Sequence, residues 1–233
     1  MMDLAATHQT EARWAVARHI LPFILWVAVM SLPMSNVALR YALQTLISLV
    51  ALFVLKPWRY YPFINIRLLP LSVLVGAGVA AVWILPESGW IKQWPVLHDG
   101  YVRYFIRGSE PGNGELFAPG QCGWIFSVIR LGGSAFVIAI IEEFFWRGFF
   151  MRWLANPDFR AVDPRKVGWW IFIIISIAFG FEHGRWLVGV MAGLAYGGLY
   201  LRKGDLMAVV VAHVTTNYLL GLYVLATGAY QFW

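Results

Sequence analysis

Three charged side chains interrupt an apolar stretch of the chain, AIIEEFFWRGFF at residues 139–150. They are the carboxylates of Glu142 and Glu143 and the guanidinium of Arg147. A charge at the centre of a bilayer costs at least about 2.5–3.5 kcal/mol, so such a run predicts either a functional site or a specific ion pair. Glu143 and Arg147 are four residues apart, on one helical face, with the acid first as pairing favours. That pair fits a structural role and a catalytic role equally well.

Glu142 differs from its neighbour because Arg147 is poorly placed to neutralise it. Successive residues of an α-helix are about 100° apart, so Glu142 projects from a different side of the helix than Glu143. A carboxylate without a counter-ion in a low-dielectric site takes up protons readily. Glu142 is therefore a candidate general base.

Two further apolar stretches carry polar side chains at helical spacing. Phe179 and His183 are four residues apart in SIAFGFEHGRW, and His213 and Asn217 are four apart in AVVVAHVTTNYLL. One histidine in an apolar helix is more often a packed core residue than a catalyst. Two such helices, beside a third that carries a carboxylate, predict a shared polar site.

The depths of these residues are compatible with one site. At about 1.5 Å of rise per residue, Glu142 and Asn217 both lie roughly 13 Å from the outer ends of their helices, and His213 lies one turn deeper. His183 is close to the outer end of its predicted helix. The four side chains meet only if that helix tilts or starts deeper in the membrane.

The composition predicts a membrane protein that positions this site. Of the 233 residues, 60% are apolar and 13% are charged, whereas about 25% are charged in soluble domains. Many of the 13 tryptophans lie near the ends of apolar runs, as in interfacial belts. The net charge of +6 is spread between apolar segments and forms no stripe, so no nucleic-acid partner is expected. The single cysteine, Cys122, excludes an internal disulfide and a cysteine metal cluster.

The apolar runs predict an all-α fold, a polytopic membrane bundle of about seven transmembrane helices, with six to eight as the range. A span needs about 20 apolar residues, and the first run reads as a retained span because it lacks a cleavage site. The predicted spans are residues 19–37, 40–55, 68–86, 133–155, 167–183, 186–201 and 205–226.

The segments between the spans divide the chain into two predicted parts. Pro, Gly and charged residues over 87–120 predict an extramembrane loop. Residues 121–131 read as an amphipathic elbow, with Gly132 and Gly133 as its bend. We therefore expect N-terminal transmembrane segments with a loop over 1–120 and a catalytic core over 121–233.

The basic residues predict the orientation of the bundle. With seven spans and the N-terminus in the cytoplasm, eleven Lys and Arg residues fall in cytoplasmic segments and four in outside loops. Such a bias follows the positive-inside rule. The chain is accordingly expected to be an integral protein of a bacterial inner membrane, with its N-terminus cytoplasmic.

Together the three polar motifs resemble the CPBP or ABI family, which includes the type II CAAX prenyl endopeptidases and bacteriocin-processing or immunity proteins. The family signature is Glu-Glu-x-x-x-Arg, Phe-x-x-x-His and His-x-x-x-Asn/Asp on successive transmembrane helices. Here the motifs read EEFFWR at 142–147, FGFEH at 179–183 and HVTTN at 213–217. The resemblance covers roughly residues 121–226, and the chain looks similar to the exosortase-associated CAAX-protease-related subgroup.

The resemblance implies an intramembrane endopeptidase of the glutamate type. Glu142 is implied to be the general base on a water, and His183 to hold and polarise that water. His213 and Asn217 are implied to stabilise the oxyanion. The implied substrate is a membrane-associated peptide or protein, lipid-modified or exported, and no cofactor is required. Two residues are implied to orient the site: Glu143 and Arg147.

Two readings of another kind remain open. Glu182 adds an acid next to His183, and we expect its carboxylate to pair with Arg185. The additional acid also leaves open a zinc peptidase, whose ligands would be His183, His213 and Glu142. Alternatively the protein is a non-catalytic immunity or scaffold protein of the lipid bilayer.

Two other functions are disfavoured by the sequence. A transporter is disfavoured because no symmetry relates the two halves of the chain. A cysteine peptidase is disfavoured because Cys122 is far in sequence from either histidine and is a poor candidate nucleophile.

Overall fold

A computed structural model describes residues 2–107 and 114–233, with only the backbone given for residues 2–9. Within these residues the fold is all-helical, and extended pairing is limited to a single bridge between Ile106 and Arg185. The predicted fold class is therefore confirmed. The helices are α1 (Met2–Met30), α2 (Val37–Leu55), α3 (Leu69–Ile84), α4 (Gly89–Lys92), α5 (Pro95–Phe105), α6 (Pro119–Cys122), α7 (Trp124–Gly132), α8 (Ala139–Glu143), α9 (Met151–Ala155), α10 (Trp169–Glu182), α11 (Trp186–Lys203) and α12 (Leu206–Thr227).

Five helical segments in the described part of the chain are long and apolar enough to cross a membrane, fewer than the seven predicted. A shorter apolar helix, α10, adds to them. The first span is also displaced from the prediction, because α1 ends at Met30 and not near residue 37. The five segments are Thr10–Met30, Val37–Tyr60, Ile66–Lys92, Trp124–Ala155 and Leu206–Thr227.

The helix ends follow from local sequence. Asp205 caps α12 by accepting a hydrogen bond from the backbone N–H of Ala208, and Asn36 caps α2 through Leu39 in the same way. Side chains of this kind satisfy the free N–H groups of a first helical turn. At the other end of α12, Gly228 has φ +71°, a conformation that glycine adopts without strain.

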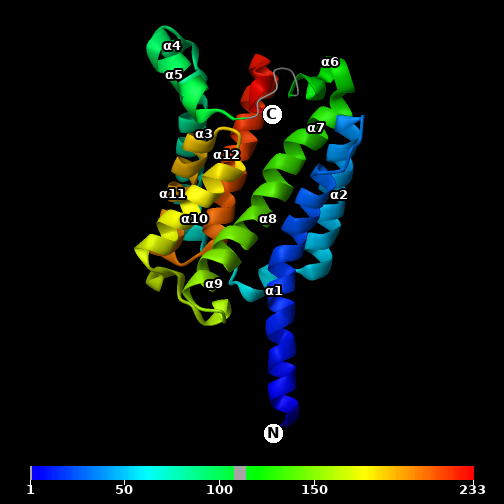
Figure 1. The fold of residues 1–233 in the computed structure, drawn as a ribbon, viewed down its shortest axis with the longest axis vertical. Helices are drawn as coiled ribbons and strands as arrows, with labels where there is room; N and C mark the ends of the chain where they lie inside the picture. The colour runs from blue at the N-terminus through cyan, green and yellow to red at the C-terminus, as the bar shows by residue number, and fades with distance from the viewer. Residues whose placement is uncertain (1, 108–113) are drawn as a thin grey trace.

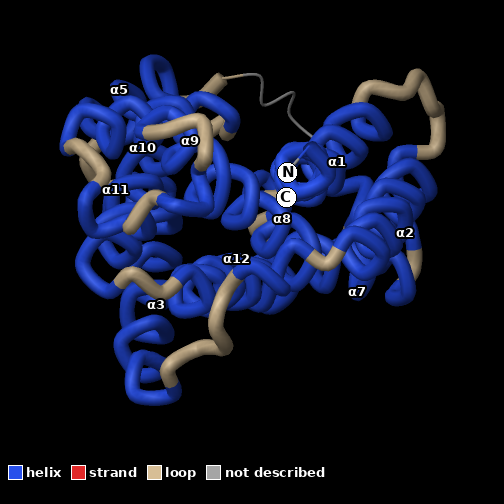
Figure 2. Tube along the Cα trace, turned by 90° about the horizontal axis from the view of Figure 1, so that it is seen from below, coloured by secondary structure: helices blue, strands red, loops and turns tan. Residues whose placement is uncertain are grey.

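One long helix carries the two glutamates through the middle of the bundle. Residues 124–155 are helical without a break, with π-helical turns over Gly133–Ile138 and Phe144–Phe150 on either side of α8. Viewed along the bundle, α8 is central, with α1, α2 and α7 on one side and α3, α10 and α11 on the other (Figure 2).

The predicted elbow at residues 121–131 is wrong. Gly132 and Gly133 both have helical dihedral angles, so the chain passes through them without bending. A Cβ at Gly133 would lie 2.5 Å from the hydroxyl of Thr45 and 2.9 Å from the ring of Tyr41. This glycine therefore permits close packing against α2 and does not mark a turn.

Helix α10 and helix α11 form an antiparallel hairpin (Figure 1). With 14 residues, α10 is about 21 Å long, shorter than the roughly 30 Å hydrocarbon core. It begins at the exposed Trp169 and Trp170, side chains typical of the interface. We therefore expect its C-terminal end at Glu182 and His183 to lie below the opposite membrane surface.

Glycine lets the two helices of this hairpin touch. A Cβ on Gly180 would lie 2.6 Å from the backbone nitrogen of Val190 and 2.8 Å from the carbonyl oxygen of Trp186. A Cβ on Gly193 would lie 2.7 Å from the carbonyl oxygen of Ser176. Small residues at such contacts are the usual basis of close helix packing in membranes.

We expect Gly180→Ala to destabilise the protein. The added methyl meets backbone atoms, which cannot move aside as a flexible side chain would, and overpacking of this kind costs about 1–3 kcal/mol. Thermal unfolding of the purified protein in detergent should show a Tm lowered by several degrees. Gly198→Ala is the matched control on α11, since the position that its added methyl would take has no neighbouring side chain or packed helix within 4 Å; an equal loss in both variants would refute the packing argument.

The predicted loop at 87–120 is mostly helical where the structure describes it. Helices α4 and α5 follow α3 directly, and α6 precedes the long helix. Arg185 at the tip of the hairpin forms an ion pair with Glu87, with 3.0 Å between Nη2 and Oε2. Pro95 and Pro119 stand in the first turn of α5 and α6, where proline is tolerated, and so do not interrupt a helix. Residues 108–113 lie outside the described part.

Candidate active site

The centre of the site is a buried chain of three charged or polar groups from two helices. Arg147 Nη1 donates to Glu143 Oε1 at 3.0 Å, so the ion pair expected from the spacing is present. The same carboxylate oxygen lies 2.8 Å from His213 Nδ1 on α12. Both charged side chains are fully buried. Because an ionised carboxylate only accepts hydrogen bonds, Nδ1 of His213 must carry its proton, which leaves Nε2 free.

Glu142 faces the same imidazole from its own side of the helix. Its Oε2 lies 3.7 Å from His213 Nε2, and this oxygen is buried without a hydrogen-bond partner among the described residues. Arg147 does not pair with Glu142, as the helical geometry predicted. An ionised carboxylate placed in this way is costly unless it gains a proton or a partner.

His183 caps the short helix α10 with its ring held by the backbone. Its Nδ1 lies 2.8 Å from the carbonyl oxygen of Phe179, which only accepts. The proton therefore sits on Nδ1, and Nε2 is a free acceptor. Its ring also packs against Trp83 of α3, at 5.4 Å between ring centroids. The Phe-x-x-x-His spacing thus fixes the tautomer of the histidine as well as its position.

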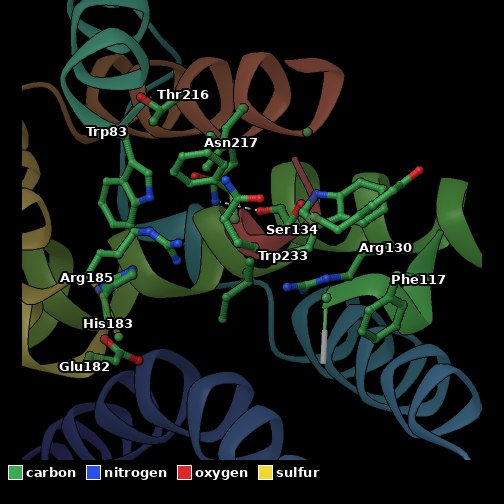
Figure 3. A pocket seen from close by; sticks show the side chains of 18 of the residues that line it. Trp83, Phe117, Arg130, Ser134, Glu182, His183, Arg185, Thr216, Asn217 and Trp233 are labelled. Carbon is green, nitrogen blue, oxygen red and sulfur yellow. Dashed lines mark hydrogen bonds between the residues drawn. The ribbon is translucent and has the colours of Figure 1, made fainter. Parts of the chain in front are cut away.

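Asn217 is oriented by the long helix opposite it. Its Nδ2 donates to the carbonyl oxygen of Ser134 at 2.9 Å, as the dashed line in Figure 3 shows. That carbonyl lies in a π-helical stretch, where the regular α-helical hydrogen bonds are interrupted. The second N–H of the amide is left for a ligand of the pocket.

Aromatic rings hold this assembly on the side of α11. The ring of Tyr196 stacks on His213 at 4.7 Å between centroids, and its hydroxyl donates to Thr216 at 2.7 Å. The guanidinium of Arg147 lies 4.1 Å above the ring of Phe179, a favourable cation–π contact. Phe179 therefore supports both the arginine and His183, which explains its place in the motif.

All four residues predicted to act on the substrate line one cavity of about 960 Å³. Its lining includes residues of α4, α5 and the C-terminal segment, which lie at the end of the molecule opposite the N-terminal end of α1 (Figure 1). The structure therefore brings together Glu142, His183, His213 and Asn217, with Glu143 and Arg147 directly behind them.

Residues 124–219 match the family model described as type II CAAX prenyl endopeptidase Rce1-like. This segment is an Rce1-like domain. It contains all three motifs and the long helix, α10, α11 and most of α12. No curated protein and no solved structure matches the chain.

The Rce1-like domain, with the long apolar helices, supports a membrane endopeptidase of the CAAX type in an integral membrane protein. The family match does not test membership of the exosortase-associated subgroup, and it does not test the predicted boundary at residue 120. Both stay predictions. Helix α3 lies outside the matched segment and packs along α12, so the N-terminal part contributes to the walls of the site.

The expected ion pair between Glu182 and Arg185 is wrong. Arg185 pairs with Glu87, whereas Glu182 Oε2 accepts a hydrogen bond of 2.8 Å from Trp146 Nε1. The reason is the end of α10: Glu182 is its last residue and turns toward the long helix, while Arg185 follows the turn and faces α3. Figure 3 shows the side chains of Glu182 and Arg185 on different sides of His183.

The zinc set of His183, His213 and Glu142 stays an alternative prediction. Within the described part of the chain, no three His, Cys, Asp or Glu side chains are grouped to hold a metal ion. The free Nε2 of each histidine is compatible with a zinc ligand, because a metal-bound imidazole usually donates its other N–H to a carboxylate or a carbonyl oxygen. Cys122 contacts the carbonyl oxygen of Ala118 and no histidine.

Several residues of the site carried no usable signal in the sequence. Tyr196, Thr216 and Ser134 are common core or helix residues, and nothing in their spacing links them to the three motifs. Trp83 comes from the N-terminal part, in which no motif was found. Only for Glu143 did the sequence give such a signal. A carboxylate next to the general base can orient a histidine ring by accepting a hydrogen bond from one of its nitrogens.

Proposed function

We propose that this protein is an intramembrane endopeptidase of the glutamate type. The observation that carries the proposal is the carboxylate of Glu142, whose buried Oε2 has no hydrogen-bond partner among the described residues, in a cavity that it shares with two histidines held by Nδ1. Peptide hydrolysis needs a base for water and donors where negative charge develops. These residues can supply both.

In this mechanism Glu142 and His183 prepare the water. The water donates one hydrogen bond to the Glu142 carboxylate and the other to Nε2 of His183, which is an acceptor in the tautomer described above. As the water oxygen bonds to the peptide carbon, its proton passes to Glu142. The same proton then goes to the amide nitrogen as the C–N bond breaks, so that Glu142 returns to its carboxylate form.

The oxyanion is stabilised from α12. Asn217 donates the amide hydrogen that Ser134 does not use. His213 donates through Nε2 only when that nitrogen also carries a proton, and the resulting imidazolium is stabilised by Glu143 at 2.8 Å. Glu143 and Arg147 thus orient His213 and balance its charge. The resemblance implied only that these two residues orient the site, so this role is more specific.

The direct test uses a synthetic peptide with an S-farnesyl cysteine close to its C-terminus, because CAAX sequences are prenylated at that cysteine. Wild-type protein in liposomes should release a C-terminal fragment that mass spectrometry detects. His213→Ala should lower kcat by about 10²–10³-fold, the usual effect of removing one oxyanion donor. Unchanged turnover in His213→Ala would contradict the assignment, provided that the variant inserts normally.

The zinc alternative makes the opposite prediction for metal chelation. In the glutamate mechanism, cleavage should continue after incubation with 1,10-phenanthroline, and elemental analysis of the purified protein should find no zinc in stoichiometric amount. Loss of cleavage with the chelator, restored by added zinc, would favour zinc held by His183, His213 and Glu142.

The remaining alternative is a non-catalytic immunity or scaffold protein, which would tolerate Glu142→Gln. Comparing the membrane proteomes of cells with the wild-type and the Glu142→Gln protein separates the two readings, since a peptidase leaves an unprocessed substrate behind. We further propose a bacterial inner membrane, a cytoplasmic N-terminus and therefore a cavity that opens outside, where lipidated or exported proteins are available.

A further inference from the structure

A half-buried arginine that belongs to none of the three motifs shares the wall of the cavity. Arg130 lies in α7, and its guanidinium faces the cavity next to Phe117 (Figure 3). It stacks 4.4 Å from the ring centre of Tyr41 and 5.1 Å from that of Phe117. The two rings hold the side chain in place without neutralising it.

This guanidinium has no anionic partner among the residues that the structure describes. It forms no ion pair with any carboxylate whose side chain is described, and its Nε is buried without a hydrogen-bond partner. Three other cations that line the cavity, Arg40, Lys92 and Arg107, also form no ion pair with a described carboxylate, but none of them has a side-chain nitrogen buried without a hydrogen-bond partner. Arg185 pairs with Glu87, and Arg40 donates to the carbonyl oxygen of Leu32. The buried Nε lacks the partner that buried polar atoms usually have, and this indicates a ligand that binds the guanidinium from the cavity.

The position of Arg130 on the long helix relates it to the general base. Arg130, Ser134, Ile138 and Glu142 are spaced four residues apart, and all four line the cavity. In a regular α-helix twelve residues would turn Arg130 about 120° away from Glu142. The π-helical turns over Gly133–Ile138 hold more residues per turn and bring these positions onto one face.

The distance along this face limits the ligand. Twelve residues rise by at most about 18 Å, and an extended peptide covers about 3.3–3.6 Å per residue. A peptide whose scissile bond lies at Glu142 therefore reaches Arg130 within about five residues. Guanidinium groups bind carboxylates with two parallel hydrogen bonds, a geometry that fits a chain end.

We propose that Arg130 binds the C-terminal carboxylate of the substrate and so places the scissile bond a few residues upstream at Glu142. This assignment rests on the proposed function and adds to it a residue that selects substrates by their free C-terminus. A C-a-a-X peptide ends three residues after its prenylated cysteine, an extended length of about 10–11 Å, so the side chains of Arg130 and Glu142 span the rest of the distance between the two positions.

The test compares two fluorescent farnesylated peptides that differ only at the end, one with a free carboxylate and one with a carboxamide. In vesicles of neutral phosphatidylcholine, wild-type protein should show a KM about 10- to 100-fold lower for the carboxylate, the range of a charge-assisted hydrogen bond. The kcat values should be similar. In Arg130→Gln the difference should disappear, and Arg130→Lys should restore only part of it, because lysine lacks the paired geometry.

Arg40→Gln is the matched control, since Arg40 also lines the cavity but contacts a backbone carbonyl; it should keep the preference for the carboxylate. Equal KM values for the two peptides in the wild type would overturn the proposal. So would an equal loss for both peptides in Arg130→Gln, the result of a purely structural role. An effect of Arg130→Gln seen only in vesicles with anionic phosphatidylglycerol would assign Arg130 to a lipid phosphate and also overturn it.

A binding measurement separates this proposal from the catalytic one. Fluorescence anisotropy with the Glu142→Gln protein reports peptide affinity without turnover. Tighter binding of the carboxylate peptide there, together with no cleavage by the wild type, would support the role of Arg130 and refute the peptidase. Cleavage by the wild type with equal binding of both peptides would do the reverse.

Discussion

Glutamine in place of Glu142 is expected to lower kcat for a farnesylated peptide by about 10²–10⁴-fold, the usual contribution of a general base. The amide keeps the shape of the side chain but cannot take a proton from water. It also relieves a buried carboxylate that has no hydrogen-bond partner in the described structure. Stability should therefore be equal to that of the wild type or higher, even though activity is lost.

The measurement is steady-state cleavage in liposomes, accompanied by thermal unfolding of the same preparations. Glu115→Gln is the matched control, because Glu115 lines the outer part of the same cavity, is exposed and forms no ion pair within the described residues. Retained turnover in Glu142→Gln would defeat the glutamate mechanism. A loss of both turnover and folded protein would show instead that Glu142 is a structural group.

Alanine in place of Arg147 is expected to impair folding as well as activity. The change leaves Glu143 fully buried with only His213 as a partner, and removing one member of a buried ion pair costs about 3–5 kcal/mol. The cation–π contact with Phe179 and the bond from Nη2 to the carbonyl oxygen of Gly193 are lost with it. Less protein should be recovered from membranes, with a clearly lower apparent Tm.

A double variant distinguishes the loss of charge balance from the loss of packing. Replacing Arg147 by Met and Glu143 by Gln removes both charges while keeping similar volumes, and such exchanges are often neutral for stability. We expect the double variant to recover most of the folded protein but little activity, because the imidazolium of His213 then lacks its carboxylate. If Arg147→Ala alone retains the wild-type Tm, the pair does not stabilise the fold.

The periodicity of apolar residues and the positions of the charges were sufficient to predict the all-helical membrane fold and the buried ion pair at its centre. Glu143 and Arg147 pair as their four-residue spacing predicts, since that offset places two side chains together in any helix. The order and spacing of the three motifs also led to the Rce1-like family. In each case the information is local or lies in a fixed spacing.

Features that depend on packing between distant segments could not be predicted in the same way. Gly132 and Gly133 read as a bend, but packing against Tyr41 and Thr45 of α2 explains the small residue there. Glu182 read as the partner of Arg185, but Trp146 and Glu87 are the actual partners. Proximity in sequence suggested both interpretations, and contacts more than 30 residues away in the chain replaced them.

The sequence by itself determined which residues are available for chemistry and which helices carry them, because residue type and helical spacing are properties of each segment alone. Only the tertiary structure decided how the groups combine: that α10 ends at the cavity, that Glu143 holds His213, and that π-helical turns align Arg130 with Glu142. The physical reason is that a buried polar group must find a partner wherever packing offers one, and that partner usually lies on another helix.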